Sequence, residues 1–245
     1  MRRILLLIVL ISCISINSKA QETVSFAELM ANTVLKDFPP AIEGRPGIPA
    51  KWSYDYALAM KGIEGVWHKT SNKKYFDYLQ KGMDSFVDND GNIRGYKEAD
   101  HNIDNVLGGR ILLTLYAVSR KPKYYKAALL LRNQLKTQPR TKEGGFWHKR
   151  IYPWQMWLDG LYMGEPFYAE WAATFNEDTA FNDIARQFIL MEKHSVDAKN
   201  GLMYHGYDES REQRWADKTT GRSPNFWARA MGWYGMGLVD ALEYF

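Results

Sequence analysis

Apolar side chains recur every three or four residues along nearly the whole chain, and few folds are compatible with that spacing. The interval matches the 3.6-residue turn of an α-helix and puts the apolar side chains on one helix face. Helices are predicted over residues 22–36, 52–66, 76–86, 103–118, 122–136, 155–176, 179–194 and 226–245. No stretch alternates apolar and polar residues over the length of a strand, so we predict an all-α fold.

Glycine, proline and asparagine separate these segments, which predicts a series of helical hairpins joined by turns. The sixth helix contains Gly164 and Pro166, and we expect a break there because proline removes a helical hydrogen bond. Two segments form a weak repeat. Asp104 precedes Gly109 by five residues, as Asp159 precedes Gly164, and the separation of 55 residues fits one hairpin with its loops.

The first twenty residues have the order of a secretory signal peptide: two arginines, an apolar run, and a small-residue cleavage site ending at Ala20. We therefore predict export. The apolar run of about 13 residues is shorter than the roughly 20 that a membrane-spanning helix needs, so no transmembrane span is predicted. Leu-Ile-Ser-Cys ending at Cys13 is similar to a lipobox. The protein is thus either periplasmic after cleavage at Ala20 or a lipoprotein anchored at Cys13.

Residues 21–245 have the length of one domain. Three of the 32 lysines and arginines lie in the leader, and the remaining 29 against 28 acids are not typical of a nucleic-acid binder. Because Cys13 is the only cysteine, neither a disulfide nor a cysteine metal site is expected in the domain. No glycine or proline follows the last predicted helix, which ends at Phe245, so we expect the domain to be truncated at its C-terminus.

Asp104 and Asp159 occupy equivalent places in the repeat, each near the start of a predicted helix. They would project from the same rim of a stack of hairpins, and two acids facing one cavity are typical of acid catalysis on sugars. Each could instead only stabilise the first turn of its helix. Around Asp159 lie Trp147, Trp154 and Trp157. Such rings either fill the core or exclude water and keep a carboxyl protonated.

Two cationic or titratable side chains are further candidates. His205 follows a turn at Gly201 and could reach a ligand hydroxyl, or be structural. Arg229 lies within an apolar run and needs a partner, either a structural acid or the carboxylate of a substrate. Neither a dinucleotide-binding loop nor a zinc-protease or serine-hydrolase motif occurs, so no metal and no cofactor are predicted.

Five motifs together resemble glycoside hydrolase family 105, the unsaturated rhamnogalacturonyl hydrolases. They are Trp52-Ser-Tyr54, His101-Asn-Ile-Asp104-Asn, the block from Trp154 to Phe167, Gly201-Leu-Met-Tyr-His205-Gly-Tyr-Asp, and Phe226-Trp227-Ala-Arg229-Ala-Met-Gly-Trp233. The resemblance implies an (α/α)6 barrel of helical hairpins with the site at one open end. It also implies that Asp159 is the catalytic acid and base, and Asp104 its partner carboxylate. The residues implied to bind the sugar are Tyr54, Lys149, Met163, His205, Trp227, Arg229 and Trp233.

The substrate implied by the resemblance is an unsaturated galacturonyl-rhamnose oligosaccharide left by a lyase acting on the pectin rhamnogalacturonan. The reaction would hydrate the C4=C5 vinyl ether, and the glycosidic bond would then break without direct attack. The last motif also occurs in the related unsaturated glucuronyl hydrolases of family 88, which leaves a glucuronyl substrate open. An ordinary inverting glycosidase and a non-catalytic glycan-binding lipoprotein remain further alternatives.

Overall fold

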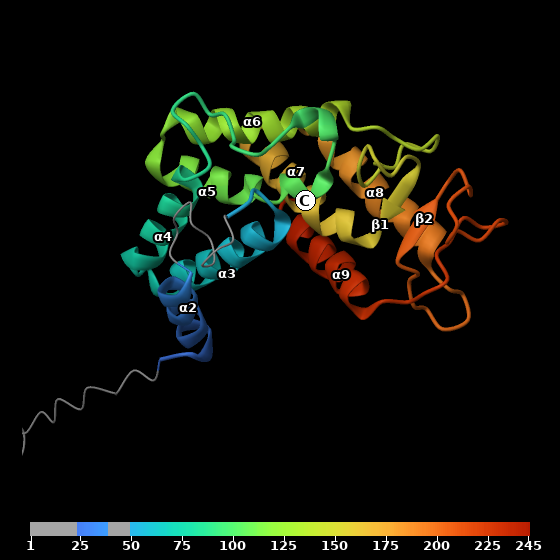
Figure 1. Cartoon of the computed structure of the whole chain (residues 1–245), viewed down its shortest axis with the longest axis horizontal. Coiled ribbons are helices and arrows are strands. Elements are labelled where there is room, and N and C mark those ends of the chain that lie inside the picture. Colours follow the sequence, from blue (N-terminus) through green and yellow to red (C-terminus); the bar gives the residue numbers. More distant parts are fainter. Residues whose placement is uncertain (1–23, 39–49) are drawn as a thin grey trace, which may run out of the picture.

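The structure is a computed structural model that describes residues 24–38 and 50–245 (Figure 1). The predicted signal peptide and the lipobox at Cys13 lie outside the described residues. Within the described part of the chain no helix is long and apolar enough to cross a membrane.

Helices make up most of the described chain, as the apolar periodicity predicts. The α-helices are α2 (Phe26–Asp37), α3 (Tyr54–Thr70), α4 (Lys73–Asp84), α5 (Gly109–Ser119), α6 (Pro122–Thr137), α7 (Leu158–Phe175), α8 (Ala180–Ser195) and α9 (Ala228–Leu242). The short elements are the 3₁₀ turns η1 (Glu98–Asp100) and η2 (Ile103–Val106) and the strands β1 (Gln155–Trp157) and β2 (Gly206–Asp208). The predicted all-α class is confirmed.

Successive helices form hairpins, because turns of only a few residues make neighbours antiparallel. α3 packs on α4, α5 on α6, and α7 on α8, while α9 lies along α7 (Figure 1). Local signals set the helix ends: Ser25 and Glu28 form a capping box on α2, and Pro122 occupies the first turn of α6.

The core centres on α7, which α5, α6, α8 and α9 contact. The predicted break near Gly164 and Pro166 is wrong, because α7 runs without interruption through both residues. Burial explains the difference: Pro166 is enclosed by neighbouring elements, and packing on all sides holds a helix that one missing hydrogen bond would weaken. Gly164 has a different role, since a Cβ there would lie 3.1 Å from Cγ2 of Ile103.

Two other predicted helices differ at their starts. Residues 155–157 form β1, which pairs antiparallel with β2, so α7 begins at Leu158. The helix predicted over 103–118 is divided into η2 and α5. The division falls at Gly108 and Gly109, where Cβ atoms would meet the rings of Trp52 and Phe167 at 2.5 Å. These ends of η2, β1 and α7 carry the candidate site.

Candidate active site

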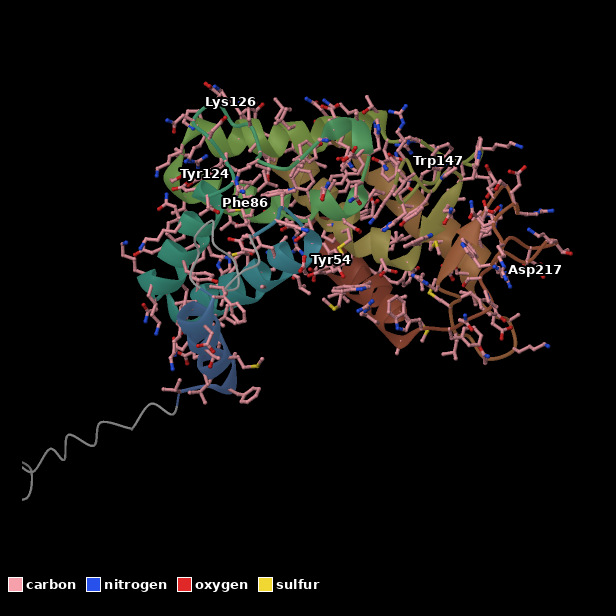
Figure 2. All side chains as sticks on the ribbon, viewed as in Figure 1. Tyr54, Phe86, Tyr124, Lys126, Trp147 and Asp217 are labelled. Carbon is pink, nitrogen blue, oxygen red and sulfur yellow. The ribbon has the colours of Figure 1, made fainter. Side chains whose placement is uncertain are left out.

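The predicted acids lie where the chain enters helices on one side of the molecule. Asp104 belongs to η2, ahead of α5, and Asp159 is the second residue of α7. η2 packs against α7, which brings the two repeat positions to neighbouring elements. Figure 2 places Trp147 on the side of the molecule that carries β1 and β2, with Tyr54 nearer its middle.

Asp159 is joined to His205. The backbone N–H of Leu158 donates to the carbonyl oxygen of His205 at 3.1 Å, which fixes the start of α7 against the start of β2. The side chains then meet, with Nε2 of His205 2.9 Å from Oδ2 of Asp159. Both side chains remain partly exposed, at 27% and 16%. The predicted catalytic acid therefore has a positioned partner and access to a ligand.

Two consecutive residues, His148 and Lys149, hold Asp104 as an anion. Lys149 Nζ lies 2.6 Å from Oδ2, and His148 Nε2 lies 3.2 Å from Oδ1. Burial on its own would raise the pKa of Asp104, but hydrogen bonds from His148 and Lys149, together with the positive charge of Lys149, lower the pKa from 3.8 to about 2. Asp104 thus supplies a fixed negative charge at neutral pH.

One indole ring lies between these two pairs. The ring of His148 stacks on Trp157 at 4.6 Å, and the ring of His205 lies 5.4 Å from the same indole. Tyr152 also stacks on Trp157, at 4.9 Å. Both histidines that hold the acids therefore contact Trp157, which ties the two carboxylates to one rigid centre.

A hollow of about 520 Å³ opens beside Asp159 and His205, within the size range of small-molecule sites. Its lining is mostly aromatic and comes from β1, the start of β2 and the segment before α9. The lining residues are Trp157, His205, Gly206, Trp215, Ser223, Pro224, Asn225, Phe226 and Trp227. Aromatic faces suit the apolar faces of sugar rings, while His205 gives the hollow a polar group beside the acid.

Arg229 stands at the edge of this hollow. Its guanidinium carbon lies 4.0 Å from the ring centre of Trp227, which itself contacts the ring of His205 at 4.9 Å. Arg229 is exposed and forms no ion pair with any residue that the structure describes. Of the two partners predicted for this arginine, a structural acid is absent from the described residues, and the carboxylate of a substrate stays a prediction.

Of the seven predicted sugar-binding residues, only His205 and Trp227 belong to the lining of this hollow. Trp233 packs on Tyr162 at 5.0 Å and on Tyr54 at 6.4 Å, and Met163 is buried in the core. The cause is the close approach of α9 to α7, where a Cβ at Gly237 would lie 2.8 Å from the carbonyl oxygen of Leu161. Lys149 reaches the site through Asp104.

The structure adds three residues that sequence reasoning did not select: His148, Tyr152 and Trp157. Trp157 and His148 lay within the aromatic stretch around Asp159, but nothing in the sequence separated them from core aromatics. The described residues contain no group of three or more His, Cys, Asp or Glu able to hold a metal ion.

Known proteins similar to this chain were found both by sequence and by structure. The sequence model of Glycosyl Hydrolase Family 88 matches residues 26–245. A solved glycoside hydrolase from family 105 of C. acetobutylicum is 47% identical, with a TM-score of 0.84, over 89% of this chain and 59% of that one. A possible family 105 member from Klebsiella pneumoniae shares the fold, with a TM-score of 0.66 and 21% identity over 79% of this chain and 48% of its own.

A curated relative, the 24.9 kDa protein in picA locus of Rhizobium radiobacter, is 50% identical over 80 residues, 33% of this chain and 34% of that protein. The chain thus spans only part of the relatives it matches, 59% of the family 105 structure. Its helical hairpins agree with the helical barrel fold of these neighbours, and the predicted resemblance to family 105 is confirmed. The chain belongs to glycosyl hydrolase family 88.

Proposed function

We propose that this chain carries the catalytic centre of a glycoside hydrolase that removes unsaturated galacturonic acid from rhamnogalacturonan fragments by hydrating its C4=C5 double bond. The observation that carries the proposal is the Asp159–His205 hydrogen bond, at 2.9 Å, on the edge of an aromatic hollow. A carboxylic acid placed there can exchange one proton with a ligand, and the adjoining Asp104 adds a fixed negative charge.

Proton transfer to carbon is the first step. Protonated Asp159 donates its proton to C4, and the positive charge that develops is shared by C5 and the ring oxygen. Asp104 is ionised at neutral pH because His148 and Lys149 hold its pKa at about 2, and its charge favours this cation. The hydrogen bond from His205 fixes the direction in which the Asp159 carboxyl points.

Water then adds to C5 and gives a proton back to the Asp159 carboxylate, which restores the acid for the next turnover. The product of addition is a hemiketal. It opens by breaking the bond between C5 and the ring oxygen, and the hemiacetal left at C1 collapses to release the second sugar. In this series of steps the second sugar leaves through its glycosidic oxygen in a spontaneous step. The reaction therefore needs no second acid.

Recognition of the uronic acid is assigned to Arg229. An exposed guanidinium with no acid partner among the described residues, stacked on Trp227, matches a ligand carboxylate in a bidentate pair. The rings of Trp157, Trp215 and Trp227 provide surfaces for the two sugar rings.

A second candidate is an unsaturated glucuronyl hydrolase, which the match to the family 88 sequence model favours. Both activities consume the conjugated double bond, so its ultraviolet absorbance reports either one. The full-length protein would be mixed with unsaturated galacturonyl-rhamnose and, separately, with an unsaturated glucuronyl disaccharide. The disaccharide whose absorbance falls faster identifies the substrate.

The acid is tested in the same assay. Asp159→Asn is expected to abolish the fall in absorbance while leaving disaccharide binding measurable by calorimetry. Asp178→Asn, an exposed acid near the far end of α7, is the matched control and should keep full activity. Near-normal turnover by Asp159→Asn would refute the assignment, and binding of both disaccharides without any fall would favour a glycan-binding protein.

Export remains part of the proposal. The mass of the mature N-terminus would distinguish cleavage after Ala20 from lipidation at Cys13.

A further inference from the structure

A second, much smaller cavity lies beneath the candidate site, between β1, α7 and α8. Its volume is about 10 Å³, and its polar lining side chains are His148, Glu165 and Gln187. The remaining lining residues are Ile103, Phe146, Met156, Trp157, Gly160 and Leu161. A cavity of about 10–15 Å³ is the smallest that accommodates one water molecule, and a buried water typically has two to four polar partners.

Glu165 is the unusual member of this lining. Its side chain is buried, with 2% of the residue exposed, and Oε2 accepts no hydrogen bond from the residues that the structure describes. Long helical side chains lean toward the N-terminal end of their helix, so its carboxyl extends toward Leu161 and Gly160. That direction leads to His148.

Burial favours the protonated form of the Glu165 carboxyl. Burial raises the pKa of Glu165 well above 4.5, and the nearby Asp183 raises it further, against the opposing effect of Arg140 and Arg132. Both arginines are already engaged, Arg140 with Asp183 at 2.7 Å and Arg132 with Glu177 at 2.6 Å. A protonated Glu165 carboxyl would have no hydrogen-bond partner for Oε2 among the described residues.

His148 presents the complementary atom. Its Nε2 faces Asp104 at 3.2 Å, while its Nδ1 is buried and has no hydrogen-bond partner among the described residues. Gly160 makes room for this nitrogen, since a Cβ there would lie 3.0 Å from Nδ1. The two unpartnered atoms, on Glu165 and His148, line the same cavity.

We propose that one water molecule occupies this cavity, accepts the proton of Glu165 in a hydrogen bond, and donates to Nδ1 of His148 and to Oε1 of Gln187. Gln187 Oε1 already accepts from the N–H of Phe146 at 2.7 Å and has a second lone pair for the water. The bridge keeps the His148 proton on Nε2, where it donates to Asp104. Glu165 is thus a positioning residue that acts on Asp104 through His148, and this role in catalysis rests on the proposed function.

The tautomer can be measured without any assay of activity. In the full-length protein labelled with ¹⁵N-histidine, the His148 ring signals are expected to show a protonated Nε2 and an unprotonated Nδ1 that accepts a hydrogen bond. His148→Gln assigns those signals. Finding the proton on Nδ1 in the wild-type protein would overturn the proposal, whatever the protein's substrate.

Two substitutions separate positioning from packing. Glu165→Gln retains an N–H donor for the water and should keep the Nε2-protonated form and most of kcat. Glu165→Leu fills similar space without a donor, and should shift the His148 ring signals and lower kcat about 10- to 100-fold, as loss of a histidine's outer partner does at metal sites, with little change in KM. Unchanged ring signals in Glu165→Leu would contradict the bridge. If Glu165→Leu shifts the His148 ring signals as expected but the wild-type protein has no hydrolase activity, the result counts against the proposed function and not against the water bridge.

Discussion

Asp159 and His205 lie 46 residues apart in the chain, yet their side chains meet at 2.9 Å. The contact depends on the two-stranded pairing of β1 with β2, because Gly206 pairs with Trp157 and sets His205 beside the first turn of α7. The short antiparallel pairing of β1 with β2 therefore brings His205 to Asp159 and gives the carboxyl a hydrogen-bond partner in a fixed direction.

The first prediction concerns that bond. His205→Ala is expected to lower kcat by on the order of 10²-fold, because the Asp159 carboxyl loses the partner that orients it for proton transfer. KM should change less. The measurement is the rate of absorbance loss at saturating and limiting disaccharide. His194→Ala is the control, since His194 lies outside the hollow and pairs with Glu143. Equal losses in both variants would argue against a specific role of His205.

The second prediction concerns Arg229. Arg229→Met should reduce kcat/KM about 10- to 100-fold, because hydrogen bonds to a charged partner contribute about 1.5–3 kcal/mol. A substrate whose carboxylate is converted to an amide should lose affinity for the wild-type protein but show almost no further loss with Arg229→Met. Arg186→Met, which removes an exposed arginine on α8, is the matched control. If the loss caused by the amide substrate and the loss caused by Arg229→Met add fully, Arg229 does not contact the carboxylate.

The sequence was sufficient to locate most helices and to put Asp104 and Asp159 near helix starts, because both features follow from local patterns, while the role of the two acids stays a prediction. Apolar periodicity marks a helix wherever packing occurs on one face, and Asp104 and Asp159 occupy matching places in a repeat. The continuity of α7 could not be predicted in this way. Pro166 opposes a helix locally, and only tertiary burial of α7 overrides it.

The side chains that contact the two acids were harder to predict from the sequence. His148 reaches Asp104 only because the loop before β1 folds onto η2, where the N–H of Ile103 donates to the carbonyl oxygen of His148 at 3.1 Å. No spacing in the sequence encodes a contact between two loops. Met163 and Trp233 illustrate the reverse case, since their motifs suggested sugar contacts and the packing of α9 on α7 places them outside the lining of the hollow.

The third prediction concerns acid stability. Asp104 has a pKa of about 2 in the folded protein against 3.8 as its ordinary value, so its ionised form favours the folded state above pH 4. That contribution, about 2 kcal/mol, is lost as the pH falls from about 4 through 2. Urea unfolding at pH 5 and pH 2.5 should show a smaller fall in unfolding free energy for Asp104→Asn than for the wild-type protein. Parallel curves would contradict the stabilisation of ionised Asp104 by His148 and Lys149.

The fourth prediction concerns Glu170, a partly buried acid outside the lining of the hollow. Burial raises the pKa of Glu170 from 4.5 to about 7, despite Lys61 and despite Arg110, whose Nε lies 3.7 Å from Oε2. A raised carboxyl binds its proton more tightly when folded, so the unfolding free energy should fall as the pH rises from about 4.5 to 7, by on the order of 3 kcal/mol, and level off above that.

Glu170→Gln removes the titration and keeps the shape of the side chain. Relative to the wild-type protein, this variant should therefore gain stability between pH 5 and pH 8, measured as the difference in urea-unfolding free energy at the two values. Glu98→Gln, an exposed acid in η1, should follow the wild-type curve. If Glu170→Gln also follows that curve, Glu170 is ionised throughout this range and its pairing with Arg110 outweighs its burial.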